Sequence, residues 1–284
     1  MKYHLFPKFF RHLSLEDMME RCSNASLDGA VALVRDGYWI ERKTLAKDLT
    51  KYTAVAEKAG MDVSFAFTDI PIEELIRDDS PLRIIADGGI RTVRLGIIGR
   101  NAAGHVREIH DYSRKLVGDI CRIVEKLSIR AVIQLHGVVG IHTDTEGCHP
   151  HNATAAWHLV RDLDPAHISI MIDPGNNYHQ EGYECFDYQI RLLGEYIGAV
   201  GTKDACILRS GPKDSPSKGW EPHFVPCYEG QANWYDIYSE LRRIGFDGPM
   251  ILMPFYNQDN FQKLYTRFLR EIEYLRQIER QVIS

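Results

Sequence analysis

Short apolar runs alternate with longer amphipathic segments along the whole chain, and this rhythm constrains the fold more than any other feature. The apolar runs lie at residues 3–6, 29–34, 61–67, 92–98, 131–135, 168–172, 198–202 and 249–253. Segments with helical periodicity follow them, at residues 14–22, 45–60, 71–89, 105–127, 153–163, 186–197, 234–245 and 261–278. Strands that alternate with helices predict a parallel sheet. Eight such units predict an α/β protein whose sheet closes into a (β/α)8 TIM barrel.

We expect one barrel domain over residues 1–284. An open, doubly wound sheet is the competing arrangement, but the Gly-rich phosphate-binding fingerprint typical of that fold is missing from the sequence. A loop rich in Gly, Pro and Ser, at residues 211–220, follows the seventh apolar run. Because the strand–helix rhythm resumes after it, this loop is typical of an active site and not of a linker between domains.

Charge and composition exclude several classes of partner. The formal net charge is −5 and the isoelectric point is near 6.2, whereas nucleic acids and anionic membrane surfaces bind basic faces. No apolar run approaches the roughly 18 residues of a membrane helix, and the N-terminal residues lack a signal peptide's apolar stretch. The cysteines are scattered without a Cys-x-x-Cys pair, which favours reduced thiols. The sequence therefore predicts a cytoplasmic protein that binds a small molecule, with no nucleic-acid or membrane partner.

Polar side chains gather where the later strands are predicted to end, and this end of a TIM barrel carries its function. They are Gln134, His136, Asp173, Asn176, Asn177, Lys203 and Asp204. A loop at residues 142–151 adds histidines and acids, which are common ligands of divalent metals. Each feature also has a structural interpretation. Asp173 precedes Pro-Gly and suits a turn, Lys203 and Asp204 suit a salt bridge that orders a loop, and the histidine-rich loop suits a solvated surface.

Four stretches carry a resemblance to a known family: "AVIQLHG", "ISIMIDPGN", "GAVGTKDA" and the segment from "VPCYEG" to "GFDGPMILM". Together with the strand–helix rhythm, they resemble the xylose-isomerase-like TIM barrel superfamily of sugar isomerases and epimerases over nearly the whole chain. The resemblance implies a divalent metal (Mn, Co, Zn or Mg), held by Glu, Asp or Glu, His and Glu on the last four strands. Those ligand positions fall on Gln134, Asp173, Gly201 and Met253. Only Asp173 matches a ligand type, so the usual metal centre is expected to be altered or missing.

The family's chemistry is proton transfer next to the carbonyl of an open-chain sugar. The metal holds adjacent hydroxyl and carbonyl oxygens, and two glutamates move the proton through an enediolate whose charge the metal stabilises. The resemblance implies no cofactor besides the metal. Dimers are common among these relatives, so a homodimer is expected by analogy alone.

Three functions remain open from the sequence. The first is an isomerase-, epimerase- or lyase-like enzyme acting on a small carbohydrate or polyol, with Lys203, His136 or Glu229 as proton donors or acceptors. Its substrate contacts are expected from Gln134, Asn176, Asp204, Trp220 and Tyr256. The second is an enzyme with a rebuilt metal site made by Asp173, His136 and the 142–151 loop. The third is a non-catalytic carbohydrate-binding or regulatory barrel. The lack of a Gly-rich phosphate loop favours an unphosphorylated ligand.

Overall fold

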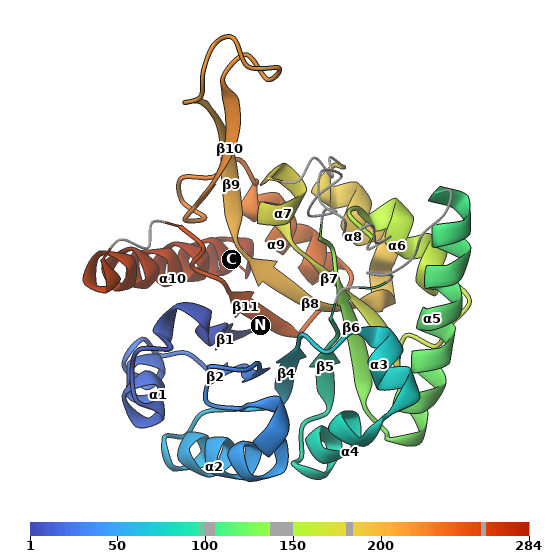
Figure 1. Cartoon of the computed structure of the whole chain (residues 1–284). Coiled ribbons are helices and arrows are strands. Elements are labelled where there is room, and N and C mark those ends of the chain that lie inside the picture. The colour runs from blue at the N-terminus through green and yellow to red at the C-terminus, as the bar shows by residue number, and fades with distance from the viewer. Residues whose placement is uncertain (97, 99–105, 137–149, 180–183, 257–259, 284) are drawn as a thin grey trace.

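The computed structural model describes residues 1–284 except 97, 99–105, 137–149, 180–183, 257–259 and 284 (Figure 1). The strands of its main sheet are β1 (Lys2–Leu5), β2 (Gly29–Ala30), β3 (Ala32–Val34), β4 (Phe65–Thr68), β5 (Thr92–Arg94), β6 (Arg130–Gln134), β7 (Ile168–Ile172), β8 (Ile197–Thr202) and β11 (Pro249–Leu252). They neighbour one another in the order β2-β1-β11-β8-β7-β6-β5-β4-β3, and the pairs are parallel. Because Val31 alone separates β2 from β3, the two ends of this order are continuous in the chain, and the sheet closes into a barrel. The predicted (β/α)8 TIM barrel is confirmed.

Helices cover the outside of this barrel (Figure 1). They are α1 (Leu15–Asn24), α2 (Leu45–Lys58), α3 (Ile72–Arg77), α4 (Ser80–Asp87), α5 (Val106–Lys126), α6 (Ala153–Val160), α7 (Pro174–His179), α8 (Phe186–Leu193), α9 (Trp234–Arg243) and α10 (Phe261–Ile283), with short 3-10 helices η1 (Pro7–Phe10), η2 (Arg42–Thr44) and η3 (Gly194–Tyr196). Local signals in the sequence fix several of their ends. Ser14 caps α1 by accepting a hydrogen bond from the Asp17 amide at 3.0 Å, and Gly60 lies just beyond α2 with a φ of 69°.

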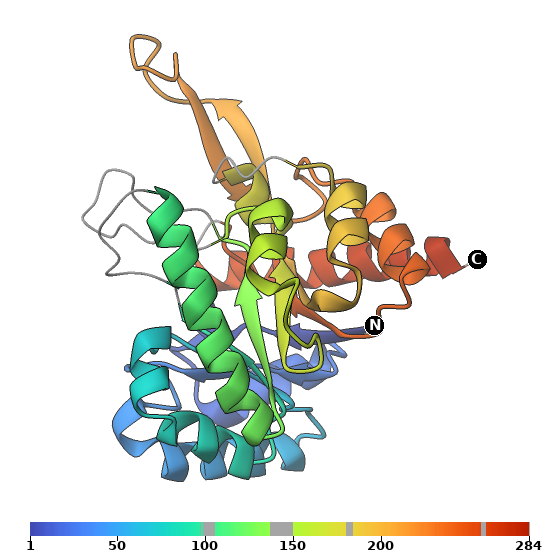
Figure 2. The same cartoon turned by 90° about the vertical axis from the view of Figure 1, so that its right-hand side faces the viewer.

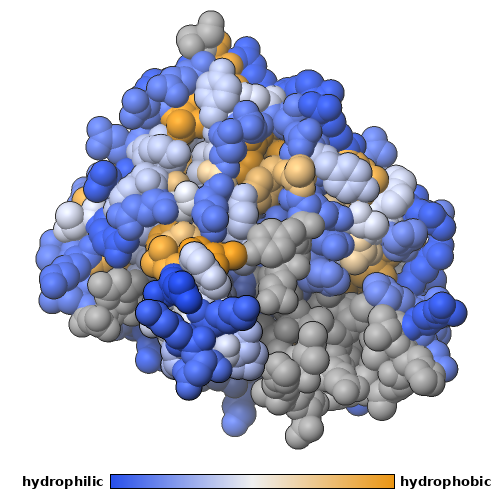
Figure 3. Space-filling model, turned by 90° about the horizontal axis from the view of Figure 1, so that it is seen from above, coloured by the Kyte–Doolittle hydropathy of each residue, from blue (hydrophilic) through white to orange (hydrophobic). Residues whose placement is uncertain are grey.

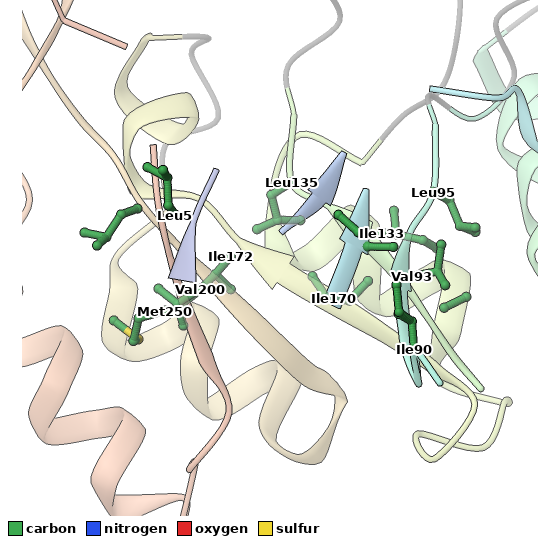
Figure 4. Packing of buried hydrophobic residues seen from close by; sticks show 14 of the residues in the cluster. Leu5, Ile90, Val93, Leu95, Ile133, Leu135, Ile170, Ile172, Val200 and Met250 are labelled. Carbon is green, nitrogen blue, oxygen red and sulfur yellow. The ribbon is translucent and has the colours of Figure 1, made fainter. Parts of the chain in front are cut away.

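Strand alternation divides the buried apolar residues into two cores. Side chains of one parity, such as Phe67, Val132 and Met171, pack inside the barrel. Those of the other parity, such as Ile133 and Val200, belong to the larger cluster between the barrel and its helices, part of which Figure 4 shows. This alternation matters for function. Every second side chain of a strand points toward the barrel interior, and the alternation extends to the first residue after the strand.

The structure differs from the sequence prediction in three places. Residues 71–89 form two helices, α3 and α4, because Asp78 takes an extended conformation and Pro81 opens a new helix. The predicted strand at 92–98 ends at Arg94. Asp173 is followed directly by the short helix α7 and not by a turn alone.

The loop predicted after the seventh strand is mostly a β-hairpin. Strands β9 (Asp204–Arg209) and β10 (Trp220–Val225) pair in an antiparallel register and project beyond the body of the barrel, as Figures 1 and 2 agree. Gly219, at the end of the connecting segment, has a φ of 84°, a conformation that glycine adopts without strain. The hairpin continues from β8 after one residue, Lys203, so it brings its inner end to the barrel mouth.

The outer surface gives little sign of a broad apolar face. Large exposed apolar side chains of the described residues are scattered over α5, α8, α9, α10 and the β9–β10 hairpin, and they are Tyr112, Tyr188, Leu208, Trp220, Tyr235, Leu269 and Ile283. Seen from above, the coloured surface is mainly hydrophilic with small hydrophobic patches (Figure 3). None of the helices in the described ranges is both long and apolar enough to cross a membrane.

Candidate active site

Asp173 lies at the centre of a buried polar cluster at the carboxyl end of β7. Its residue is 1% exposed, and its carboxylate accepts hydrogen bonds from the Asn176 amide (Oδ1, 3.0 Å) and the Asn176 side chain (Oδ2, 3.0 Å). The Gln134 amide also donates to Oδ2 of Asp173. Gln134 in turn accepts a hydrogen bond from Nε of Arg94 at 3.1 Å. The cluster therefore fixes the direction of each side chain, with Asp173 as the shared acceptor.

The ammonium group of Lys203 balances the charge of this carboxylate. Its Nζ lies 3.2 Å from Oδ2 of Asp173 and donates to Oδ1 of Asn176 at 2.6 Å, and its side chain is 4% exposed. Rings of Phe224 and Phe255 flank it, with centroids 4.8 and 4.6 Å from Nζ. An ammonium carries three N–H donors, and these two acceptors use two of them within the described part of the chain. Among the described residues the third N–H has no oxygen acceptor, so it is available to a ligand.

Burial lowers the pKa of Lys203 below its ordinary value of 10.5. The positive charge of Arg94 acts in the same direction, while the charge of Asp173 and its hydrogen bond oppose the shift. A lysine with a lowered pKa is a stronger acid than a solvated one, and it donates a proton or a hydrogen bond more readily to a developing oxyanion.

Helix α7 approaches Lys203 closely, and glycine permits this approach. A Cβ at Gly175 would lie 2.7 Å from Cγ of Lys203 and 2.9 Å from its carbonyl carbon. Contacts this short do not occur in real structures, so any side chain at this position would displace Lys203 or the start of α7. The Asp-Pro-Gly-Asn sequence thus holds Asn176 and Lys203 within hydrogen-bonding distance.

Lys203 faces a cavity of about 220 Å³ at the barrel mouth. Of the residues predicted for the site, Gln134, His136 and Asn176 line this cavity with it. The other lining residues are Phe6, Lys8, Arg35, Phe67, Arg94, Phe224, Met253 and Phe255. The cavity is therefore small, with an apolar wall of phenylalanines and a set of cationic and amide groups that point into it.

Five of the predicted site residues are not part of the cavity lining: Asp173, Asp204, Glu229, Trp220 and Tyr256. Glu229 is exposed and forms an ion pair with Arg267 at 2.7 Å. Trp220 lies on the projecting hairpin with 53% of its surface exposed. Tyr256 is buried near the mouth, but its hydroxyl donates to Glu271 at 2.8 Å, behind the cavity wall.

Asp204 lies on the opposite side of the chain from Lys203. Its carboxylate accepts from the Trp234 indole at 2.8 Å and from the backbone amides of Ala205 and Ala232 at 2.7 and 3.2 Å. Burial raises the pKa of Asp204 to about 6. Lys203 forms its ion pair with Asp173 and not with Asp204, the alternative that the sequence also allowed, because successive residues of an extended chain point to opposite sides.

The residues present do not fit the family's divalent metal. Asp173 is the one carboxylate among the four expected ligand positions, and both of its oxygens already accept hydrogen bonds. A Cβ at Gly201 would lie 3.2 Å from Oδ2 of Asp173, so this position does face the carboxylate, but glycine supplies no ligand. A divalent ion there would also meet the charge of Lys203. Within the described ranges no three His, Cys, Asp or Glu side chains form a metal-binding group.

The rebuilt metal site predicted from the 142–151 loop cannot be located, because residues 142–149 lie outside the described residues. His136 does lie at the cavity, whereas His151 is exposed.

Residues 82–278 match the family model described as xylose isomerase-like TIM barrel, which covers well over half of the chain. The chain belongs to this family. Its resemblance to solved structures of the family is at the level of the fold. It superposes on D-psicose 3-epimerase from Clostridium cellulolyticum, solved with D-tagatose, with a TM-score of 0.71 at 12% identity, covering 98% of this chain and 99% of that one.

Two further solved structures with a similar fold have other chemistries in their names. A 3-keto-D-glucoside 4-epimerase from E. coli gives a TM-score of 0.66 at 14% identity, over 98% of this chain and 99% of that one. A probable 3-DHS dehydratase from Bacillus anthracis gives 0.65 at 16% identity, over 97% and 99%. The solved structures that this chain resembles in fold therefore include two proteins named as epimerases and one named as a probable dehydratase.

Three cations of the cavity were missed by the sequence prediction, which considered only the last four strands. Lys8 and Arg35 follow β1 and β3, and Arg94 is the last residue of β5. The signal for Arg94 was present, since a guanidinium inside an otherwise apolar run is costly to bury without a partner or ligand. Phe224 was missed for another reason: it reaches the cavity from β10, and the sequence prediction had no hairpin at this place.

Proposed function

We propose that this protein is a sugar-modifying enzyme, of the isomerase, epimerase or dehydratase type, in which the Lys203 ammonium takes the place of the family's metal ion. The observation that carries the proposal is the position of Nζ, held by Asp173 and Asn176 at the carboxyl end of the barrel and facing a small cavity. A cation at this place can stabilise the negative charge that develops on a carbonyl oxygen when a neighbouring C–H bond is broken.

In the proposed reaction, the imidazole of His136 accepts the proton from the carbon next to the carbonyl of an open-chain carbohydrate. The electron pair of that C–H bond forms a C=C bond, and the carbonyl π electrons move to oxygen. The third N–H of Lys203 donates to this enolate oxygen, while Asp173 and Asn176 hold the ammonium in place. If His136 releases its proton to water and water protonates the opposite face of the same carbon, the product is an epimer. If the imidazolium protonates the former carbonyl carbon while the adjacent hydroxyl proton passes to the enolate oxygen, the product is an isomer. If the imidazolium protonates a β-hydroxyl, which leaves as water while the carbonyl re-forms, the product is dehydrated.

Burial of the cavity supports this chemistry. Lys203 and Gln134 are each 4% exposed, and phenylalanine rings form much of the wall. A hydrogen bond to an oxyanion is stronger in such an environment than in water because the effective dielectric constant is lower. General acid–base groups placed in this way typically contribute a factor of about 10²–10⁴ to the rate.

The test is deuterium incorporation from D2O into a panel of aldoses, ketoses, their 6-phosphates and uronic acids, followed by NMR. We expect exchange at the carbon next to the carbonyl, reduced at least about 100-fold in Lys203→Met and in His136→Gln. Glu229→Gln is the matched control, because Glu229 pairs with Arg267 outside the cavity lining. Exchange that survives Lys203→Met in a folded variant would contradict the proposal. Binding of a sugar without exchange of any C–H in the panel would favour the non-catalytic barrel instead.

A further inference from the structure

The cavity is lined by more cations than its own carboxylates balance. Lys8, Arg35, Arg94 and Lys203 all line it. The only carboxylates that form ion pairs with these four, among the described residues, are Asp173, paired with Lys203, and Asp69. This part of the chain therefore carries an excess of two positive charges at the barrel mouth, although the whole chain has a formal net charge of −5.

Asp69 forms ion pairs with two guanidinium groups, those of Arg35 and Arg94. Arg35 donates to it through Nε, while Nη1 of Arg94 lies at the longer distance of 3.8 Å from its other oxygen. Burial lowers the pKa of Arg94 to about 10, and its Nε donates a hydrogen bond to the side-chain oxygen of Gln134. Its terminal N–H groups are thus directed toward the same region as Arg35, and a guanidinium offers five donors in a planar fork that suits oxyanions.

Lys8 has no ion pair within the described ranges. It is half-buried, its Nζ lies 4.7 Å from the ring centroid of Phe255, and burial together with the charges of Arg35 and Lys203 lowers its pKa. A half-buried ammonium close to two other cations is electrostatically unfavourable, and the charge of Asp69 offsets this only in part. A bound anion would reduce the repulsion among these cations.

The distance between the two lysine nitrogens has an upper limit. Nζ of Lys8 and Nζ of Lys203 lie 4.7 and 4.6 Å from the ring centroid of Phe255, so the two nitrogens cannot be farther apart than the sum of these distances. One open-chain sugar can contact both nitrogens within this limit. Its carbonyl end would lie at Lys203 and its far end at Lys8, Arg35 and Arg94.

We propose that the substrate is an acidic sugar, one that carries a carboxylate or phosphate group remote from its carbonyl, and that Lys8, Arg35 and Arg94 bind this anionic group. The inference rests on the proposed function for the assignment of Lys203 to the carbonyl end, but not for the anion site itself. The unphosphorylated ligand that the sequence favoured stays one of its two forms, and a phosphate is the other, because a set of side-chain cations can bind either anion without a Gly-rich loop.

The test measures affinity and not turnover. D-glucose, D-glucuronate and D-glucose 6-phosphate differ only at the sixth carbon, and with inorganic phosphate they form the probe set for calorimetric titration at low ionic strength. We expect at least one of the two acidic sugars to bind at least tenfold more tightly than glucose, with an affinity that falls as salt is added. Which of the two binds more tightly distinguishes a carboxylate from a phosphate site.

Two variants with the same change of charge separate the site from the surface. Lys8→Met is expected to weaken binding of the acidic sugar at least tenfold and to lower its affinity relative to that of glucose. Lys51→Met, on the exposed face of α2, is the matched control and is expected to change neither. The proposal is overturned if no anion of the set binds more tightly than glucose, or if both variants behave alike. Preference for acidic sugars without deuterium exchange would contradict the proposed function alone, and exchange confined to neutral sugars would contradict this inference alone.

Discussion

The pair of Lys203 and Asp173 gives a stability prediction that follows directly from its geometry. The two charges are 3.2 Å apart, with side chains 4% and 0% exposed. At an effective dielectric constant of about 20, their attraction is about 5 kcal/mol, and it compensates the loss of hydration of each ion. Replacing Lys203 by Met leaves the carboxylate buried with amide donors only. We expect this variant to lose about 3–5 kcal/mol of unfolding free energy, the usual cost of an uncompensated buried charge.

A double-mutant cycle measures this coupling. Lys203→Met, Asp173→Asn and the double variant are compared with wild type by urea unfolding at pH 7, followed by circular dichroism. We expect each single variant to be destabilised and the double variant to be more stable than the sum of the two losses predicts, by at least about 2 kcal/mol. If the losses add, the two groups do not interact as a charge pair, and the assignment of Lys203 as the resident cation is refuted.

The pH dependence of Asp173→Asn provides a second readout of the same pair. Without the carboxylate, burial and Arg94 still lower the pKa of Lys203, and nothing opposes the shift. The folded state then binds its proton less tightly than the unfolded state. Stability therefore rises with pH up to the ordinary lysine pKa of 10.5, and the deficit of Asp173→Asn relative to wild type is expected to shrink between pH 7 and pH 9. A deficit that is constant over this range would contradict the assignment.

Three further outcomes are expected. Burial raises the pKa of Glu271 from 4.5 to about 7, so the protonated carboxyl favours folding and this contribution to stability is lost as the pH rises through that interval. Glu271→Gln should therefore remove about 3 kcal/mol of the pH dependence of the unfolding free energy, measured from pH 5 to pH 8. Gly175→Ala should displace Lys203 and reduce the rate of exchange more than it lowers thermal stability, whereas loss of stability alone would show that the close approach serves only packing. Glu229→Gln should change the unfolding free energy by less than about 1 kcal/mol, because its ion pair with Arg267 is largely solvated, and a larger loss measured by urea unfolding would show that the pair is structural.

The barrel could be predicted from the sequence because its signals are repetitive and local. Each strand reads as an apolar run and each helix has its own periodicity, so an error in one element, such as the division of 71–89 into α3 and α4, does not change the topology. The rule that function lies at the carboxyl ends of the strands also predicts Gln134, His136, Asn176 and Lys203 at one end of the barrel, where all four line the same cavity.

The rest of the site depends on information that a single sequence does not carry locally. Lys203 and Asp204 are neighbours in the chain, but the phase of the strand decides that only Lys203 points toward Asp173. Lys8 and Arg35 resemble ordinary surface residues in the sequence, and only the closure of the barrel brings them to the mouth. Trp220 was predicted to contact the substrate, but it lies on β10 of the projecting hairpin and does not line the cavity.

The central claim is that an ammonium group stands where the rest of the family is expected to hold a metal ion. The most direct measurement is the metal content per chain of the untagged protein, purified without chelator and analysed before and after incubation with Mn²⁺, Co²⁺ and Zn²⁺. Our account predicts far less than one ion per chain in both states, with deuterium exchange that is insensitive to chelator. Near-stoichiometric metal that disappears in Asp173→Asn would contradict it, and would identify Asp173 as a ligand of a rebuilt centre.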